Sequence, residues 1–143
     1  MNFISDNQST VFPEIIEYLQ EVNKNSSPSY GNDIVTNKAK NLISDFFEKK
    51  VEVRYVSSGT ASNSIALSTI SPPYGGILCS DNSHLDGDEC GAPEFFTGGA
   101  KLIKIPTSNG IISSRTLKQK INRFGLHGIH EVKLSVLDIT QIS

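Results

Sequence analysis

Small hydroxylated residues and a glycine gather in the segment Ser57-Ser58-Gly59-Thr60-Ala61, between a short apolar run and a run with helical spacing. A turn of this kind at a helix N-terminus presents free backbone N–H groups and hydroxyl donors, and the helix dipole favours an anion there. The glycine spacing fits neither the dinucleotide fingerprint nor the Walker loop. Ser58, Gly59 and Thr60 are therefore candidate phosphate ligands, and a plain serine cap on a tight turn is the alternative.

A second group of chemically capable residues lies in the acidic segment 81–99, which contains His84, Asp88, Glu89 and Cys90. A metal-dependent hydrolase that uses His84, Asp88 and Glu89 is one hypothesis. Zinc sites need paired Cys or His spacings, which one His and a Cys six residues later do not provide, so we expect no metal and a solvated acidic loop. Beside a phosphate-binding turn, the His84 ring has another use, because it can lie flat against an aromatic cofactor.

Two further histidines, His127 and His130, precede the last apolar run of the chain. Loops at the carboxyl ends of parallel strands build the sites of α/β proteins, and these histidines enter the other end of a strand unless their loop folds back. Surface polar residues are the alternative. Tyr30 lies in the turn-rich stretch Tyr30-Gly31-Asn32-Asp33, where a turn and a helix cap account for the residue types.

The elements that must position these residues alternate between helical and strand periods. Pro13 predicts the start of one helix, and a cap at Asn32 or Asp33 predicts the next. We expect strands over 51–56, 77–80, 102–106 and 134–139, and helices over 61–70 and from about 113 to 125. This order predicts an α/β fold with a partial, mostly parallel sheet and flanking helices. We expect an arm, helix and loop over 1–33 and an incomplete binding domain over 34–143.

Composition limits the partners of the chain. The 143 residues carry 13 basic and 15 acidic side chains, a net charge of −2, which lacks the basic surface of a nucleic-acid binder. No apolar run approaches the roughly 18–20 residues of a membrane span, and residues 1–6 carry no secretory signal. Two cysteines form no disulfide framework. These features predict a cytoplasmic protein with no nucleic-acid or membrane partner.

Taken together, the motifs resemble the threonine aldolase family, pyridoxal-phosphate-dependent lyases of fold type I that are grouped with the beta-eliminating lyases. The matching stretches follow the family order along almost the whole chain, and the run from Cys90 to Leu102 is the most specific. These stretches are Phe3–Asn7, Tyr30–Asp33, Ser58–Asn63, His84–Leu102 and Ile139–Gln141.

The resemblance implies a role for each matching residue. Ser58, Gly59 and Thr60 would hold the phosphate of pyridoxal 5'-phosphate, and His84 would stack on its pyridine ring. Ser5 and Asn7 would help to define the substrate side, Tyr30 would lie near the site of a neighbouring subunit, and His130 would be the second active-site histidine. The family cleaves threonine to glycine and acetaldehyde. Either His84 or His130 could act as the base or position a water, and the sequence does not decide between them.

The resemblance also implies what this sequence lacks. The Schiff-base lysine of the family, the aspartate that pairs with the pyridine nitrogen and the small C-terminal domain all fall after the matched segment. Lys101 and Lys133 do not have the context of that lysine. We therefore expect the N-terminal portion of the large domain of such an enzyme, with an amino-acid substrate in the intact enzyme and no catalysis alone. A homo-oligomer or a complementary C-terminal chain would complete it. The alternative is a non-catalytic interaction module that pairs with a full-length paralogue or a complementary chain.

Overall fold

The computed structural model describes residues 8–140 and divides the chain into two compact units, 1–54 and 55–143. The division after Arg54 separates two compact units. The boundary expected after Asp33 separates an arm from a binding domain by function, and it stays a prediction. Within residues 8–140, the structure contains no helix with the length and apolar character that crossing a membrane requires.

The first unit contains two amphipathic helices, α1 (Pro13–Val22) and α2 (Ile34–Phe46). Both begin where the sequence predicts. Pro13 occupies the first turn of α1, where its missing N–H costs nothing. Asp33 caps α2, because its carboxylate accepts the backbone N–H of Thr36 at 2.7 Å. Neither helix has a fully buried residue, so their apolar faces are left open.

The strand expected over residues 51–56 does not form. Its apolar residues alternate with charged ones, as in a strand with one buried face, and Val51 and Val53 are half-buried. A strand also needs a neighbour that pairs with its backbone N–H and C=O groups. The three strands of the described residues all lie after Tyr74 and pair with one another, so this segment has no partner among them.

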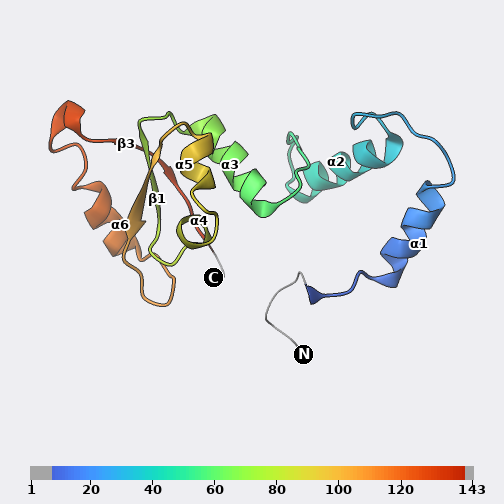
Figure 1. Ribbon diagram of the computed structural model, residues 1–143, viewed down its shortest axis with the longest axis horizontal. Helices are drawn as coiled ribbons and strands as arrows, with labels where there is room; N and C mark the ends of the chain where they lie inside the picture. The colour runs from blue at the N-terminus through green and yellow to red at the C-terminus, as the bar shows by residue number, and fades with distance from the viewer. Residues whose placement is uncertain (1–7, 141–143) are drawn as a thin grey trace. The chain divides into compact units, whose positions relative to one another are not determined.

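The second unit is built on a parallel sheet of three strands in the order β2-β1-β3 (Figure 1). These strands are β1 (Gly75–Ser80), β2 (Lys101–Ile105) and β3 (Lys133–Leu137), and all three were expected. Every residue of β1 is buried, as a central strand covered on both faces requires. The expectation of an α/β fold with a small parallel sheet and flanking helices is confirmed.

Alternate residues of β1 face two separate apolar clusters. Ile77 and Cys79 contact Leu67 of α3 (Gly59–Ile70) and Leu85 of α4 (His84–Gly87). On the other face, Leu78 belongs to the cluster against which residues of α6 (Ser114–Ile121) pack. Figure 1 shows α3 and α6 on opposite sides of the strands. The sheet therefore places the start of α3 and the start of α4 on the same side of the unit.

The acidic segment 81–99 folds into helices, contrary to the expected solvated loop. It contains α4 and α5 (Ala92–Phe96), and α5 packs against α3. Glu89 and Pro93 are buried within it. The sequence misleads here because acidic residues and glycines usually signal solvent exposure, whereas one of these carboxylates finds two hydrogen-bond donors inside the fold.

Candidate cofactor-binding site

The N-terminus of α3 presents a set of unused donors. Ser58 is the cap residue, and its hydroxyl oxygen accepts the N–H of Ala61 at 3.2 Å while keeping its own proton to donate. The backbone N–H groups of Gly59 and Thr60 have no acceptor among the described residues. A Cβ built on Gly59 would meet no atom within 4 Å, so the side-chain position of this residue is open. This arrangement suits an anion.

His84 stands at the first position of α4, directly after the turn that follows β1. Ser83 caps this short helix by accepting the N–H of Asp86. The His84 side chain is 53% exposed, and its Nδ1 lies 2.9 Å from Oε1 of Glu89, whose side chain is completely buried. The imidazole is therefore anchored on its inner side and accessible on its outer side.

Glu89 connects the histidine to α3. The same Oε1 atom accepts the side-chain N–H of Asn63 at 2.6 Å. Asn63 lies four residues after Gly59, which is about one helical turn from the free amides. The chain of contacts Asn63–Glu89–His84 thus connects the first turn of α3 to the half-exposed imidazole. Free amides beside a flat aromatic side chain fit a phosphorylated aromatic cofactor such as pyridoxal phosphate.

A second carboxylate lies near this group. Burial raises the pKa of Asp138, the hydrogen bond from Thr140 opposes this rise, and the charge of Glu89 adds to it. Asp138 follows β3, and its backbone N–H donates to the carbonyl of Leu78 in β1. The other oxygen of Glu89, Oε2, is buried without a hydrogen-bond partner in the described part of the chain. Negative charge therefore collects at the carboxyl end of the sheet.

His130 lies at the opposite end of the sheet from His84. It ends the short helix η2 (Gly128–His130) just before β3, whose first residue, Lys133, is opposite Gly75 at the start of β1. His84 instead follows the carboxyl end of β1. The loop before β3 does not fold back, so the structure does not bring the two histidines together.

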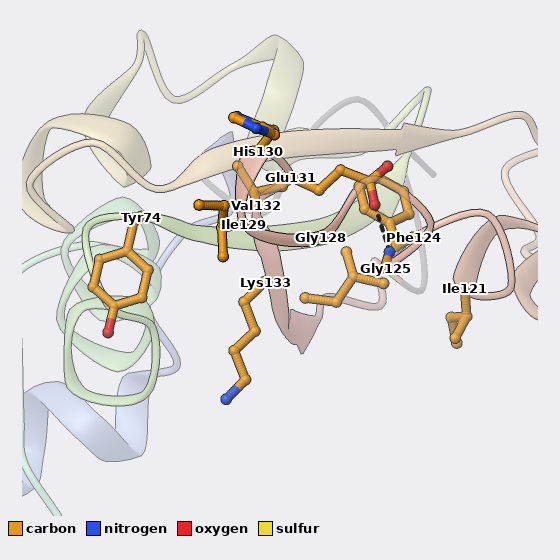
Figure 2. A pocket seen from close by; sticks show the side chains of 11 residues that line it. Tyr74, Ile121, Phe124, Gly125, Gly128, Ile129, His130, Glu131, Val132 and Lys133 are labelled. Carbon is orange, nitrogen blue, oxygen red and sulfur yellow. Dashed lines mark hydrogen bonds between the residues drawn. The ribbon is translucent and has the colours of Figure 1, made fainter.

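The surroundings of His130 form a hollow of about 880 Å³ of mainly apolar lining (Figure 2). Tyr74, Phe124 and Lys133 contribute to it. Figure 2 also shows that the carboxylate of Glu131 accepts the N–H of Gly125, at 2.6 Å. His127 is exposed and likewise belongs to this end of the unit. The role expected for His130 stays a prediction without geometric support.

The remaining expected site residues belong to the first unit. Tyr30 is 98% exposed and has a positive φ of 62°, in the turn before α2. This exposure is compatible with an interface, but its role stays a prediction. Ser5 and Asn7 lie outside the described residues.

The alternative of a metal-dependent hydrolase finds no site in residues 8–140. Within that range, no three His, Cys, Asp or Glu side chains form a group that could hold a metal ion. His84 and Glu89 do meet, but Oε1 of Glu89 is shared between His84 and the side-chain amide of Asn63.

Glu89 and Asn63 are the residues that sequence reasoning did not connect to the site. Glu89 was a metal-ligand candidate within a matching stretch, and Asn63 was only the end of another matching stretch. The spacing of these residues indicated that they could lie near the candidate residues. Asn63 lies about one turn into the helix that begins at Gly59, and Glu89 lies five residues after His84. Only the packing of α5 on α3 brings the two together.

Comparisons with known proteins show the family of the chain. The family model described as beta-eliminating lyase matches residues 2–142. A low specificity L-threonine aldolase from a Pseudomonas strain is 35% identical over 139 residues, and one from Pseudomonas aeruginosa is 36% identical over 140 residues. Each match covers 97% of this chain but 40% of the relative.

The fold also has a solved counterpart. A threonine aldolase structure from Leishmania major superposes with a TM-score of 0.84 at 24% sequence identity, over 94% of this chain and 39% of that one. The chain therefore spans about two-fifths of the length of the proteins it matches. From the family match over nearly its whole length, this chain is a member of the beta-eliminating lyase family.

Proposed function

We propose that this chain provides the phosphate-binding turn and the ring-facing histidine of a pyridoxal-phosphate-dependent lyase of the threonine aldolase type. The substrate class would be β-hydroxy-α-amino acids, with threonine giving glycine and acetaldehyde. The observation that carries the proposal is the set of free amides of Gly59 and Thr60, joined through Asn63 and Glu89 to His84. The names of the two Pseudomonas relatives support the substrate class.

Each residue has a task in this proposal. The N–H groups of Gly59 and Thr60 and the hydroxyl of Ser58 bind the phosphate oxygens, in the favourable field at the start of α3. The His84 side chain, which is 53% exposed, would stack on the flat ring of the cofactor. When bound, the cofactor supplies an electron sink for the carbon left after the Cα–Cβ bond breaks.

His84 is also the better candidate for moving a proton. It lies with the phosphate-binding turn at one end of the unit, whereas His130 lies at the other end. A neutral imidazole near physiological pH accepts a proton from a hydroxyl such as the β-hydroxyl of the substrate. We assign this role to His84 and none to His130.

We also propose that residues 1–143, assayed alone, do not cleave threonine. Covalent capture of the cofactor aldehyde needs a lysine amine placed against it. In the threonine aldolase family, which this chain resembles, that lysine lies beyond the segment matched here. No lysine among the described residues of the candidate site replaces it. The cofactor would therefore bind non-covalently.

Removal of a single amide tests the phosphate-binding turn. Gly59 is the first residue of α3, where proline is well tolerated, and Ser58 before it is extended, as the residue before a proline must be. Gly59→Pro therefore deletes one N–H donor while keeping the helix. A hydrogen bond to a charged acceptor contributes about 1.5–3 kcal/mol, so we expect affinity for the phosphate to fall about tenfold or more.

The probe is pyridoxine 5'-phosphate, because it lacks the aldehyde that would react with surface lysines. Affinity is measured by fluorescence titration of the wild type and of the variant. Ser114→Pro is the matched control, since it makes the same change at the first position of α6, away from the site, after the extended residue Ser113. Equal affinity of wild type and Gly59→Pro, or equal binding of pyridoxine without its phosphate, would refute the proposed site.

The alternative, a non-catalytic interaction module, is favoured by one observation. Large apolar side chains of α1 and α2 are exposed, among them Leu19 at 54% and Phe46 at 81%. Such faces are typical of surfaces that a second protein covers. Co-purification with a full-length paralogue or a complementary chain, without any affinity for the phosphorylated cofactor, would favour this alternative. Homo-oligomerisation is compatible with both proposals.

A further inference from the structure

We propose that Glu89, supported by Asn63, is a positioning residue that holds the His84 imidazole as its Nδ1–H tautomer and leaves Nε2 as the free acceptor. This inference deepens the proposed function and rests on it for its catalytic meaning. It concerns the protonation pattern of the chain itself, which exists whether or not a cofactor is bound.

The geometry of one oxygen atom carries the inference. Oε1 of Glu89 lies 2.6 Å from Nδ2 of Asn63 and 2.9 Å from Nδ1 of His84. The amide nitrogen of Asn63 only donates, so Oε1 is an acceptor toward it. The second carboxylate oxygen, Oε2, is buried and has no partner among the described residues.

The protonation state of the histidine follows from this acceptor. If Glu89 is ionised, both of its oxygens accept only, so Nδ1 must carry the hydrogen that it shares with Oε1. If Glu89 holds a proton on Oε2, Oε1 is still the acceptor of both contacts. In both of these states the neutral imidazole has its proton on Nδ1, and its lone pair is on Nε2. A proton on Oε1 would reverse the contact with Nδ1, and the tautomer measurement below distinguishes that arrangement from the proposed one.

The burial of Glu89 strengthens its hydrogen bond with Nδ1 of His84. The Glu89 side chain is completely buried, whereas 53% of the His84 side chain is exposed. Hydrogen bonds to a carboxylate are stronger than neutral ones, and they strengthen further away from water. The inner edge of the ring is therefore fixed, which sets the plane of the imidazole and directs the basic nitrogen away from Glu89.

The functional consequence is that two parts of the His84 side chain have different roles. The ring face is available for stacking, and Nε2 is the atom that accepts a proton from a substrate hydroxyl. With the opposite tautomer, Nε2–H would be a donor, and His84 could not act as the base. Orientation of a histidine by a carboxylate on its other nitrogen is a general way to fix the tautomer of a catalytic imidazole.

Nuclear magnetic resonance of the cofactor-free chain tests the proposal. Histidine is labelled with nitrogen-15, and the nitrogen shifts of His84 are read at a pH where its ring is neutral. We expect a protonated Nδ1, an unprotonated Nε2 and a strongly downfield Nδ1–H proton. Glu89→Gln keeps the shape and an oxygen acceptor but removes the charge, so this proton resonance should move upfield.

The matched control is Asp88→Asn, which makes the same acid-to-amide change at the adjacent residue. Asp88 is exposed, and its backbone N–H donates to the carbonyl of His84 at 2.9 Å, a bond that the substitution keeps. No hydrogen bond joins the side chains of Asp88 and His84 in the described residues. Its resonance pattern should equal that of the wild type. A wild-type His84 protonated on Nε2, or an Nδ1–H resonance that Glu89→Gln leaves in place, would overturn the proposal.

The wild-type tautomer decides the question even if the Glu89→Gln chain does not fold. Because no cofactor is present, this result is also independent of the binding test at Gly59. A chain that fails to bind the phosphorylated probe would contradict the proposed function and leave the tautomer measurement intact.

Discussion

Glu89 connects α3 and α4, because Oε1, one of its two buried carboxylate oxygens, contacts a side chain from each helix. Burying a carboxylate is costly unless donors compensate for the lost water. Here two donors reach Oε1, while Oε2 has none among the described residues. In the described residues, the donors around Glu89 therefore compensate for the lost water at one carboxylate oxygen and not at the other.

Asp138 provides a prediction at the same scale. Burial raises its pKa above the ordinary value of 3.8, the Thr140 hydrogen bond acts against this, and the charge of Glu89 adds to it. A carboxyl group with a raised pKa stabilises the fold fully below 3.8, and this contribution is lost as the pH rises through the folded value. Asp138→Asn should therefore be more stable than the wild type at pH 7, and this gain should disappear in acid.

Thermal unfolding measured across the pH range checks this expectation. Asp88→Asn serves as the control, because that carboxylate is exposed. An Asp138→Asn protein that melts at or below the wild-type temperature at pH 7 would show that the buried charge does not destabilise this strand end.

At the residue scale, the sequence indicates candidate side chains for the chemistry more readily than the residues that support them. Ser58 and Gly59 became candidates because a helix was expected to follow them, and His84 because its ring can stack on a cofactor, and their roles stay proposals. The partnership of Glu89 with Asn63 did not follow, because the two are 26 residues apart and meet only through tertiary packing. A buried carboxylate is also a rare event that composition argues against.

At the scale of elements, the helix starts are the features that local chemistry determines most directly. Side-chain caps at Asp33, Ser58 and Ser113 lie at or next to the positions that the sequence indicates. The cap at α2 was open between Asn32 and Asp33, and the structure selects Asp33. A cap residue bonds to the backbone within one helical turn, so the local sequence is enough to predict it.

The cap at Asp33 gives a second prediction. Hydrogen bonds from the Thr36 side chain and backbone lower the pKa of Asp33 below 3.8. Its contribution to stability is present above 3.8 and is lost as the pH falls through the lowered value. Asp33→Ala should reduce the helical circular dichroism signal near neutral pH, whereas the neighbouring Asn32→Ala should not. Equal losses in the two variants would contradict the assigned cap.

Strand β1 gives a third prediction, because its first residue must be glycine. A Cβ built on Gly75 would lie 2.5 Å from Oγ of Ser71 and 2.9 Å from the carbonyl oxygen of Pro72. Gly75→Ala should therefore cost about 1–3 kcal/mol of unfolding free energy, as overpacking of a core does. Urea denaturation measures this loss.

The control for Gly75 is Gly87→Ala, because a Cβ on Gly87 would meet nothing within 4 Å. We expect its unfolding free energy to stay within about 0.5 kcal/mol of the wild-type value. A Gly75→Ala chain as stable as Gly87→Ala would mean that the start of β1 is not packed as described.

The segment 51–56 is the place where the sequence pattern predicts a strand that the structure does not contain. Alternating valines predicted a strand, yet a strand forms only when another backbone pairs with it. The sequence pattern identifies a segment suited to a sheet, but it does not supply the neighbour. The other three strands formed because β1 pairs with both β2 and β3 within the described residues.

For the molecule as a whole, the exposed apolar side chains of α1 and α2 are the feature that bears on association. Helices α1 and α2 are amphipathic but bury no residue fully. Apolar surface of this extent favours association. We therefore expect the chain to form oligomers as its concentration rises.

The face of α1 gives a fourth prediction. Leu19→Ser removes one apolar contact from the exposed face, and association should weaken. Glu17→Gln changes the opposite face of the same helix and should leave association unaltered. Light scattering after size-exclusion chromatography gives the mass of each variant, and a wild type that stays monomeric throughout would contradict the expectation.

The central claim is that the start of α3 binds a phosphate beside His84. Its most direct test is an amide nitrogen–proton spectrum of the chain titrated with pyridoxine 5'-phosphate. The account predicts that the Gly59 and Thr60 amides move downfield together with His84 signals, and that pyridoxine without phosphate leaves these amides unchanged. Saturable changes confined to other segments, with Gly59 and Thr60 unaffected, would contradict it.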